Sequence, residues 1–144
     1  MMALLLALLL VTQANAAEPS WLDRAANAPL QVVGRCQSST SRWEGGSIYS
    51  YSEVSVLRVV RGTPDGALVV RQRGGQVDGI GQKVSHVSLL EPGQSYLLFL
   101  SKDDSGNWST TSKGVNRIVT SSDGSQSVAN AALDQVLSEL GGAN

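Results

Sequence analysis

The stretch IYSYSEVSVLRVVRG, from Ile48 to Gly62, is the longest run of β-type sequence in this chain of 144 residues. It is rich in Tyr, Val and Ile, and neither Gly nor Pro interrupts it before Gly62. We therefore predict one long strand here, and we expect the segments on either side to fold back onto it.

The alternation of apolar residues changes partway along this strand. Val54 and Val56 fall on one face, whereas Leu57 and Val59 fall on the opposite face. A regular strand cannot direct both sets toward one core, so we predict a β-bulge near Val56–Leu57 that shifts the register. The alternative is a straight strand that is covered on both faces. A bent, bulged strand suits a small closed barrel, because one strand must then serve both halves of it.

The other predicted strands are shorter and are separated by turn sequences. They are Leu30–Gln37, Ala67–Arg73, Tyr96–Leu100, Trp108–Thr111 and Arg117–Thr120. The segment Tyr96–Leu100 is apolar enough to be buried on both faces. The two longest predicted loops are Ser38–Ser47 and Gly74–Gly93. This pattern predicts a mainly β fold, a small barrel of five to six strands.

Two helices are expected outside the strands. A capping sequence at Ser20 favours a short N-terminal helix over Trp21–Ala26. Ser127 can cap a second helix over Val128–Leu140, which carries an apolar stripe at helical spacing. We expect this C-terminal amphipathic helix to pack on the barrel, and the alternative is a docking helix for another chain.

The first sixteen residues have the pattern of a secretory signal peptide. Met1–Val11 is an uninterrupted apolar run, too short to span a bilayer, and Ala14-Asn15-Ala16 has the form of a cleavage site. We expect cleavage after Ala16 and a secreted or periplasmic protein, and no Cys lies near that site to carry a lipid anchor. Residues 17–120 would form the barrel domain, and residues 121–144 a linker and the C-terminal helix.

Charge and cysteine content narrow the classes of partner. The net charge at pH 7 is −1 and both signs are scattered, which argues against nucleic acid or a membrane surface as partner. Cys36 is the only cysteine, so no internal disulfide can form. The strand phase directs Cys36 toward the core as a small apolar filler, and a reactive or intermolecular thiol is the alternative.

No sequence pattern for catalysis or cofactor binding is present. The glycine-rich stretch Gly74–Gly81 is followed by neither Gly-Lys-Ser/Thr nor a predicted helix, so we expect no nucleotide or other cofactor. His86 is the only histidine, and neither a zinc-binding spacing nor a nucleophile-elbow sequence accompanies it. We therefore predict a non-enzymatic protein, with a small hydrolase that uses His86 as the alternative.

Three pieces of the chain, taken in order, resemble one family. Ala26-Asn27-Ala28 runs into LQVVGR at Leu30–Arg35, the long strand ends in VVRG at Val59–Gly62, and EPGQSYLLFL follows at Glu91–Leu100. This set resembles the bacterial secreted relatives of the netrin-like module, the OB-type barrel that tissue inhibitors of metalloproteinases also use. The resemblance covers Ala25–Thr120, and it implies an OB-type fold and a role in binding.

This chain lacks the residues with which that family inhibits metalloproteinases. Those inhibitors present an N-terminal Cys whose amine and carbonyl chelate the protease zinc, whereas this mature chain is expected to begin Ala17-Glu18-Pro19. The family's disulfides are absent as well. The resemblance therefore implies a binding module. An inhibitor or accessory domain of a secreted metalloprotease, acting without chelation, is the alternative.

The candidate binding residues lie where an OB-type barrel binds, along one strand face and the loops beside it. They come from the two predicted long loops and the strand between them: Arg42, Trp43, Arg71, Arg73, Ile80 and His86. Trp and Arg are the residues that most often dominate interfaces. We expect this set to bind another extracytoplasmic protein, and for Trp43 the alternative is that it folds back over a barrel end.

Overall fold

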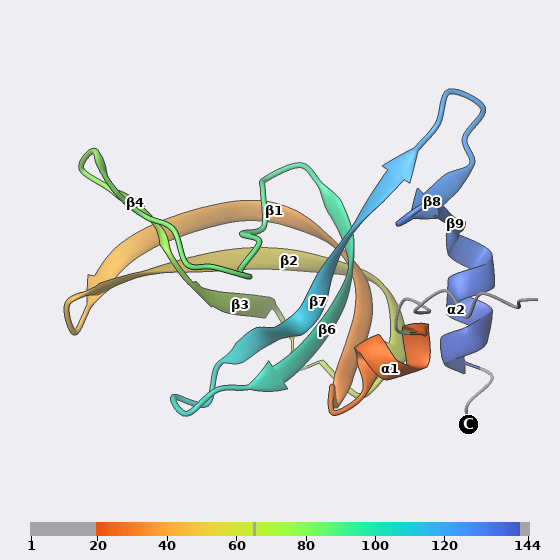
Figure 1. Cartoon of the computed structure of the whole chain (residues 1–144), viewed down its shortest axis with the longest axis horizontal. Helices are drawn as coiled ribbons and strands as arrows, with labels where there is room; N and C mark the ends of the chain where they lie inside the picture. Colours follow the sequence, from red (N-terminus) through yellow and green to blue (C-terminus); the bar gives the residue numbers. More distant parts are fainter. Residues whose placement is uncertain (1–19, 65, 142–144) are drawn as a thin grey trace, which may run out of the picture.

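The computed structural model describes residues 20–64 and 66–141 and is mainly β, with one helix near each end of this range (Figure 1). The helices are α1 (Trp21–Ala25) and α2 (Leu133–Gly141). The strands in this part of the chain are β1 (Leu30–Glu44), β2 (Ser47–Arg61), β3 (Leu68–Arg73), β4 (Gly75–Val77), β5 (Ile80–Gln82), β6 (Ser95–Lys102), β7 (Trp108–Thr120), β8 (Gln126–Val128) and β9 (Ala131–Ala132). The predicted signal peptide and its cleavage site lie outside the described residues.

Seven of these strands form one sheet in the order β3-β2-β1-β6-β7-β8-β9, and β4 pairs with β5 in a separate hairpin. The sheet curls until β3 meets β7, where Val70 pairs with Trp108 in parallel. The described residues thus contain nine strands, whereas five to six were predicted. The additional four belong to two short hairpins, β4–β5 in the predicted loop Gly74–Gly93 and β8–β9 at the start of the predicted C-terminal helix.

The predicted loop Ser38–Ser47 is wrong, because β1 and β2 stay paired as far as their shared turn. Each strand has 15 residues, and the register runs to Glu44 opposite Ser47. Gly45 and Gly46 form the turn with φ of 56° and 85°, values that glycine adopts without strain. The Gly-Gly pair is the sequence signal for this hairpin. The β1–β2 hairpin therefore extends beyond the rest of the sheet, at the end of the molecule opposite the helices (Figure 1).

The predicted bulge in β2 is confirmed. Arg58 and Val56 lie opposite consecutive residues of β1, and Leu57 between them has no partner in that strand. The bulge does not bring Leu57 and Val59 into the core as expected, since their exposed fractions are 62% and 44%. Val56 and Val60 pack against the cores instead. The bulge therefore bends the strand and leaves two apolar side chains on the surface.

Strand β6 is buried on both faces, as its sequence predicts, and it separates two hydrophobic clusters. Tyr96, Leu98 and Leu100 face the cluster inside the curled sheet, which also contains Leu30, Val32, Cys36, Val54, Leu68, Val70 and Leu90. Leu97 and Phe99 face the cluster between the sheet and the two helices, which also contains Ala25, Ala28, Val33, Ile118, Val128, Leu133, Val136, Leu137 and Leu140. The apolar packing is therefore divided by β6 between the interior of the curled sheet and the side that the helices cover.

Two strands that were predicted separately, Trp108–Thr111 and Arg117–Thr120, are one continuous strand, β7. It pairs with β6 on both sides of an irregularity opposite Phe99. Gly114 lies in this irregularity, where a Cβ atom would come within 2.4 Å of the Phe99 carbonyl oxygen. β7 remains one strand across Gly114 because it pairs with β6 both before and after the irregularity.

The C-terminal helix starts later than predicted. The residues expected to form its first turn belong to the β8–β9 hairpin, whose turn residues Ala129 and Asn130 have φ of 47° and 65°. The helix itself begins at Leu133 and packs on the sheet through the last four apolar residues of the predicted stripe. Neither described helix is long and apolar enough to cross a bilayer.

Candidate binding surface

Arg71 holds together the end of the sheet that carries the β1–β2 hairpin. Its Nη2 atom donates to Glu44 Oε2 at 2.7 Å, its Nη1 atom to Asp103 Oδ2 at 3.0 Å, and its Nε atom to the Tyr51 hydroxyl at 3.0 Å. The guanidinium also stacks over the Tyr49 ring, 3.6 Å from the ring centroid. We call these five residues, together with Arg42, the Arg71 cluster. It ties the β1–β2 hairpin to β3 and to the turn between β6 and β7.

Glu44 receives three donors within this cluster. The donors are the Tyr51 hydroxyl, Arg71 and Arg42, and the Arg42 Nε atom lies 2.9 Å from Glu44 Oε1. These contacts lower the pKa of the Glu44 carboxyl to about 2. Arg42 also lies over the Tyr51 ring, 4.0 Å from its centroid. The carboxylate thereby holds an exposed arginine in one orientation at the hairpin tip.

Asp103 anchors the opposite side of the cluster. Burial alone would raise the pKa of its carboxyl, but donation from the Asn107 backbone, Arg71 and the Ser105 backbone lowers it overall. Burial likewise acts to lower the pKa of Arg71, and its hydrogen bonds to Glu44, Tyr51 and Asp103 raise it overall. Both groups therefore stay charged at neutral pH, and the cluster is a closed ionic network.

The opposite face of the same hairpin borders an open groove of about 930 Å³. We call it the serine groove, because Ser39, Ser41 and Ser50 line it from β1 and β2. Ser41 Oγ and Ser50 Oγ are 2.7 Å apart, and Ser50 Oγ donates to the Gly74 carbonyl at 2.9 Å. A Cβ atom on Gly75 would lie 2.3 Å from Ser41 Oγ, so β4 crosses the hairpin in close contact with these hydroxyls.

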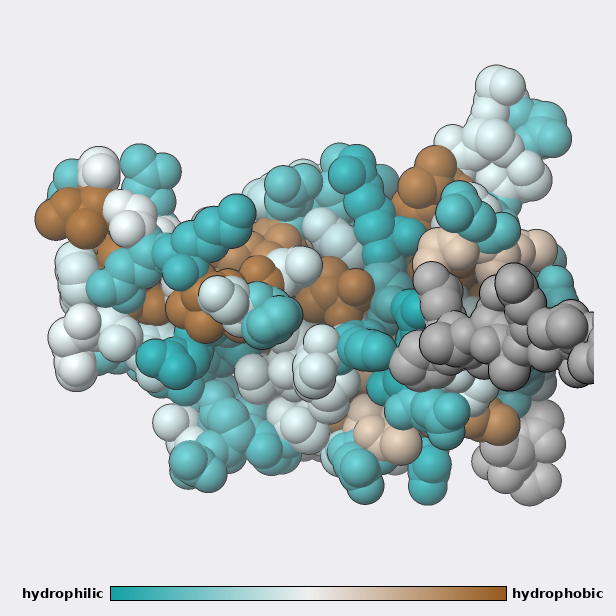
Figure 2. Space-filling view, in the orientation of Figure 1, coloured by the Kyte–Doolittle hydropathy of each residue, from teal (hydrophilic) through white to brown (hydrophobic). Residues whose placement is uncertain are grey.

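The rest of the groove comes from the β4–β5 hairpin and the segment that joins β5 to β6. This wall is largely apolar and contains Val84, Val87, Leu89 and Leu90. Figure 2 shows hydrophobic surface at the β4–β5 hairpin and along the segment that follows it. The groove thus combines a hydroxyl-lined side with an apolar side, a lining typical of sites that bind organic or peptide ligands.

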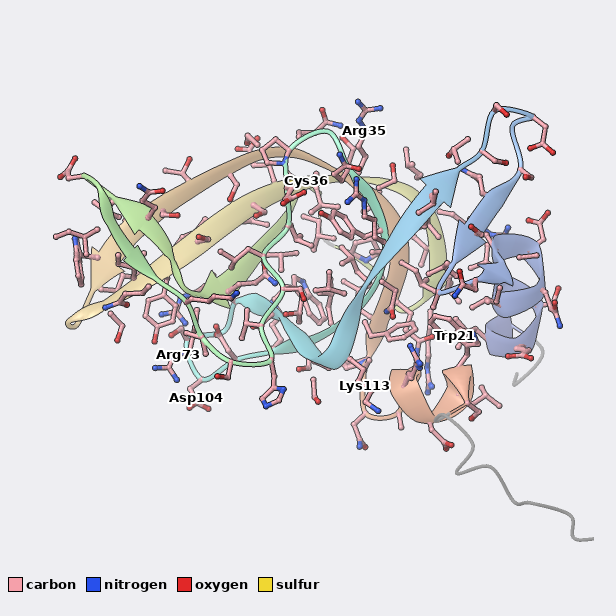
Figure 3. The ribbon with its side chains drawn as sticks, turned by 45° about the horizontal axis from the view of Figure 1, so that its top comes forward. Trp21, Arg35, Cys36, Arg73, Asp104 and Lys113 are labelled. Atoms are coloured by element: carbon pink, nitrogen blue, oxygen red, sulfur yellow. The ribbon has the colours of Figure 1, made fainter. Side chains whose placement is uncertain are left out.

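Two cations, Arg73 and Lys83, also line the serine groove. Both are exposed, and neither forms an ion pair with another residue in the ranges 20–64 and 66–141. Arg73 also borders a smaller pocket that contains Asp104, on the same side of the molecule (Figure 3). Glu91 is the one anionic residue among the described residues that line the groove, which leaves the groove with a net positive charge.

The structure places the six candidate residues in different settings. Arg42 and Arg71 belong to the Arg71 cluster, where every nitrogen of the Arg71 guanidinium donates a hydrogen bond. Trp43 at the hairpin tip and Ile80 at the tip of the β4–β5 hairpin are 45% and 54% exposed. Arg73 lines the serine groove. The sixth residue, His86, lies exposed in the segment between β5 and β6, with φ of 66°.

Sequence reasoning missed the partners that organise this surface. Tyr49, Tyr51 and Glu44 lie on the same face of the sheet as Arg71 of β3, and alternation along β2 was the available signal for the two tyrosines. Nothing in the local sequence indicates that Asp103 reaches the same guanidinium, because 32 positions separate the two residues.

Neither metal-binding nor catalytic geometry accompanies His86 in the described part of the chain. No group of three or more His, Cys, Asp or Glu side chains there could hold a metal ion. No hydrogen bond joins His86 to a carboxylate or a hydroxyl among the described residues. No family model, curated protein or solved structure matches the chain.

Proposed function

We propose that this chain is a secreted or periplasmic, non-enzymatic protein-binding module built on an OB-type, netrin-like barrel. The circuit β1-β2-β3-β7-β6 returns to β1, and five strands is the number in an OB-type barrel. Export rests on the signal-type sequence of the first sixteen residues. The near-neutral net charge favours a protein partner over nucleic acid.

OB-type barrels bind with the face of their second and third strands and with the loops after the first and fourth strands. In this chain the corresponding parts are β2, β3, the β1–β2 turn and the β6–β7 turn. Each of them, or a residue next to it, contributes to the Arg71 cluster: Tyr49 and Tyr51, Arg71, Glu44, and Asp103. The cluster therefore coincides with the surface that the proposed fold would use.

One observation carries the binding role, namely that exposed anchor residues are held on an ordered support. The Arg42 side chain is 62% exposed, yet Glu44 and the Tyr51 ring fix its position. Trp43 follows Arg42 in β1 and therefore points to the opposite face of the hairpin, the face that carries Ser41, where it is 45% exposed. Aromatic and arginine side chains dominate interface energetics, and fixing them in advance reduces the entropy lost on binding. A surface of this kind suits a protein partner.

The test compares Trp43→Ala with a matched control, Leu57→Ala. Leu57 is also an exposed, large apolar residue, but it lies at the bulge of β2, away from the hairpin tip. A partner captured by the wild-type protein from the native extracytoplasmic fraction is purified, and its dissociation constant is measured against both variants. We expect Trp43→Ala to weaken binding at least tenfold and Leu57→Ala to leave it unchanged. Equal affinities for the two variants would contradict the proposed surface.

A further inference from the structure

The outer edge of β1 changes its partner halfway along the strand. From Leu30 to Arg35 this edge pairs with β6. The main chain of Cys36 continues the pairing, because its N–H donates to the Gln94 carbonyl and its carbonyl accepts from the Gly93 N–H. Beyond that point β1 continues to Glu44 while the chain of β6 has turned away. Among the residues that the structure describes, the remaining part of β1 pairs on one side only, with β2.

The register identifies which main-chain groups face this unoccupied edge. Glu44 and Ser47 close a two-residue turn, so they form a hydrogen-bonded pair, and hydrogen-bonded pairs alternate with the others along the hairpin. The Gly74 N–H donates to the Ile48 carbonyl, which confirms that Ile48 points away from β1. The main-chain groups of Ser39, Ser41 and Trp43 therefore point outward.

These three residues present three N–H and three C=O groups in a row. Within the described part of the chain, no hydrogen bond joins any of them to another residue. An unpaired row of this kind is a template for one more strand. The serine groove lies beside it, because the side chains of Ser39 and Ser41 line that groove.

We propose that an extended segment of the partner protein adds to β1 along Ser39–Trp43, in line with β6. Residues of a paired strand lie on the same face as the residues opposite them. Guest side chains opposite Ser39 and Ser41 therefore enter the serine groove. Its apolar wall and its two cations, Arg73 and Lys83, fit a segment that combines apolar residues with an acidic one. This inference rests on the proposed binding function and names the form of the partner.

Strand addition has a signature at single residues that side-chain docking lacks. The probe is a set of nine-residue peptides selected from a displayed library on the wild-type protein, and the readout is amide hydrogen exchange by NMR. We expect the amides of Ser39, Ser41 and Trp43 to slow at least tenfold when peptide binds. The amides of Thr40 and Arg42 already donate to β2 and should not change. Protection elsewhere, or none at these three amides, overturns the proposal.

The variant Ser41→Pro removes the central outward N–H without removing a bond to β2, since proline is tolerated at an edge where the N–H faces solvent. Ser41→Ala is the matched control, because it loses the same contact with Ser50 and keeps the N–H. We expect Ser41→Pro to bind the peptide at least tenfold more weakly than Ser41→Ala, since both variants lack the hydroxyl that lines the serine groove and only Ser41→Pro lacks the N–H. Equal binding by the two variants overturns the proposal. The proposal also fails if no peptide in the library binds the wild type more tightly than it binds Ser41→Pro.

Two further outcomes separate this inference from the proposed function. If the captured partner loses affinity for Trp43→Ala but binds Ser41→Pro and Ser41→Ala equally, the binding surface stands and strand addition fails. If concentrated protein without peptide already protects Ser39, Ser41 and Trp43, a second copy of the chain occupies the edge and a foreign peptide is ruled out as its occupant.

Discussion

The sequence allows two roles for Trp43, and the exposure of its side chain distinguishes them. In a loop rich in Ser and Gly, it could anchor a partner or close the end of the barrel. In the structure it is 45% exposed and lies at the tip of the β1–β2 hairpin, and it belongs to neither hydrophobic cluster. Its surroundings therefore favour a role at the surface.

This exposure leads to a prediction for stability. Trp43→Ala should lower the free energy of unfolding by about 1 kcal/mol or less, because a surface substitution leaves no internal cavity. Phe99→Ala is the comparison, since Phe99 is fully buried and its loss should cost about 3–5 kcal/mol. Urea unfolding followed by circular dichroism measures both. A loss for Trp43→Ala close to that for Phe99→Ala would show that Trp43 is part of the core.

A second prediction at this scale concerns Cys36, which is fully buried, as its strand phase predicts. Burial raises the pKa of its thiol, so the reactive thiolate is scarce at neutral pH. A thiol reagent should therefore label native protein at least a hundredfold more slowly than urea-unfolded protein. Rapid labelling in native buffer would contradict the core position.

At the scale of elements, the Arg71 cluster adds side-chain contacts between strands β1, β2 and β3, which also pair through their main chains at this end. The β1–β2 hairpin extends beyond the two hydrophobic clusters, so polar contacts carry much of its attachment. Arg71 links it to β3 and to the β6–β7 turn through Glu44 and Asp103. The order of the proposed binding surface thus depends on charged groups.

This dependence predicts how stability changes with pH. The folded pKa of Glu44, about 2, lies below its ordinary value of 4.5, and that of Asp103 is also lowered. Their contribution is therefore complete above about pH 5 and is lost as the pH falls toward 2. Arg71→Met should reduce the acid-induced loss of unfolding free energy between pH 5 and pH 3. Tyr51 and Arg42 still contact Glu44, so the loss should shrink and not vanish.

Arg73→Met is the matched control for this measurement. It makes the same change of charge on the same strand, but Arg73 forms no ion pair with any described residue. Its pH dependence should match that of the wild type in urea unfolding at the two pH values. Equal slopes for the wild type and Arg71→Met would show that the cluster does not couple stability to pH.

At the scale of the whole molecule, the two ends have different compositions. The helical end holds the cluster that includes Phe99 and α2, whereas the far end carries the Arg71 cluster, the serine groove and the unpaired edge of β1. Apolar burial stabilises the first end and leaves the second free to expose polar and aromatic side chains. This division suits a module whose helical end provides stability while the other end binds.

The proposed export of the molecule predicts its mature N-terminus. Ala14 and Ala16 occupy the small-residue positions that the signal peptidase reads, so the exported chain should begin at Ala17. Intact-mass analysis of protein from the extracytoplasmic fraction measures this directly. Exported protein that retains Met1 would contradict the signal peptide, although it would leave the binding surface untouched.

The sequence by itself determined the features that depend on local alternation. The long strand β2, its bulge at Leu57, the two buried faces of β6 and the inward direction of Cys36 all follow from which neighbouring residues are apolar. Such patterns are visible in one segment at a time, because side chains alternate between the faces of a strand. The pair Gly45-Gly46 carried the signal for the hairpin as well.

Only the tertiary structure decided how distant segments meet. The segment Ser38–Glu44 has polar residues on both faces, and it is a strand because β2 satisfies its main-chain groups on one side. In the Arg71 cluster, Glu44 and Asp103 are 27 and 32 positions from Arg71 in the sequence, so no local pattern predicts their contact. Among the described residues, the edge of β1 beyond Cys36 is unpaired because β6 begins at Ser95, opposite Arg35. Hydrogen bonds and ion pairs between distant segments depend on the closed sheet, whereas apolar alternation depends only on the neighbouring residues.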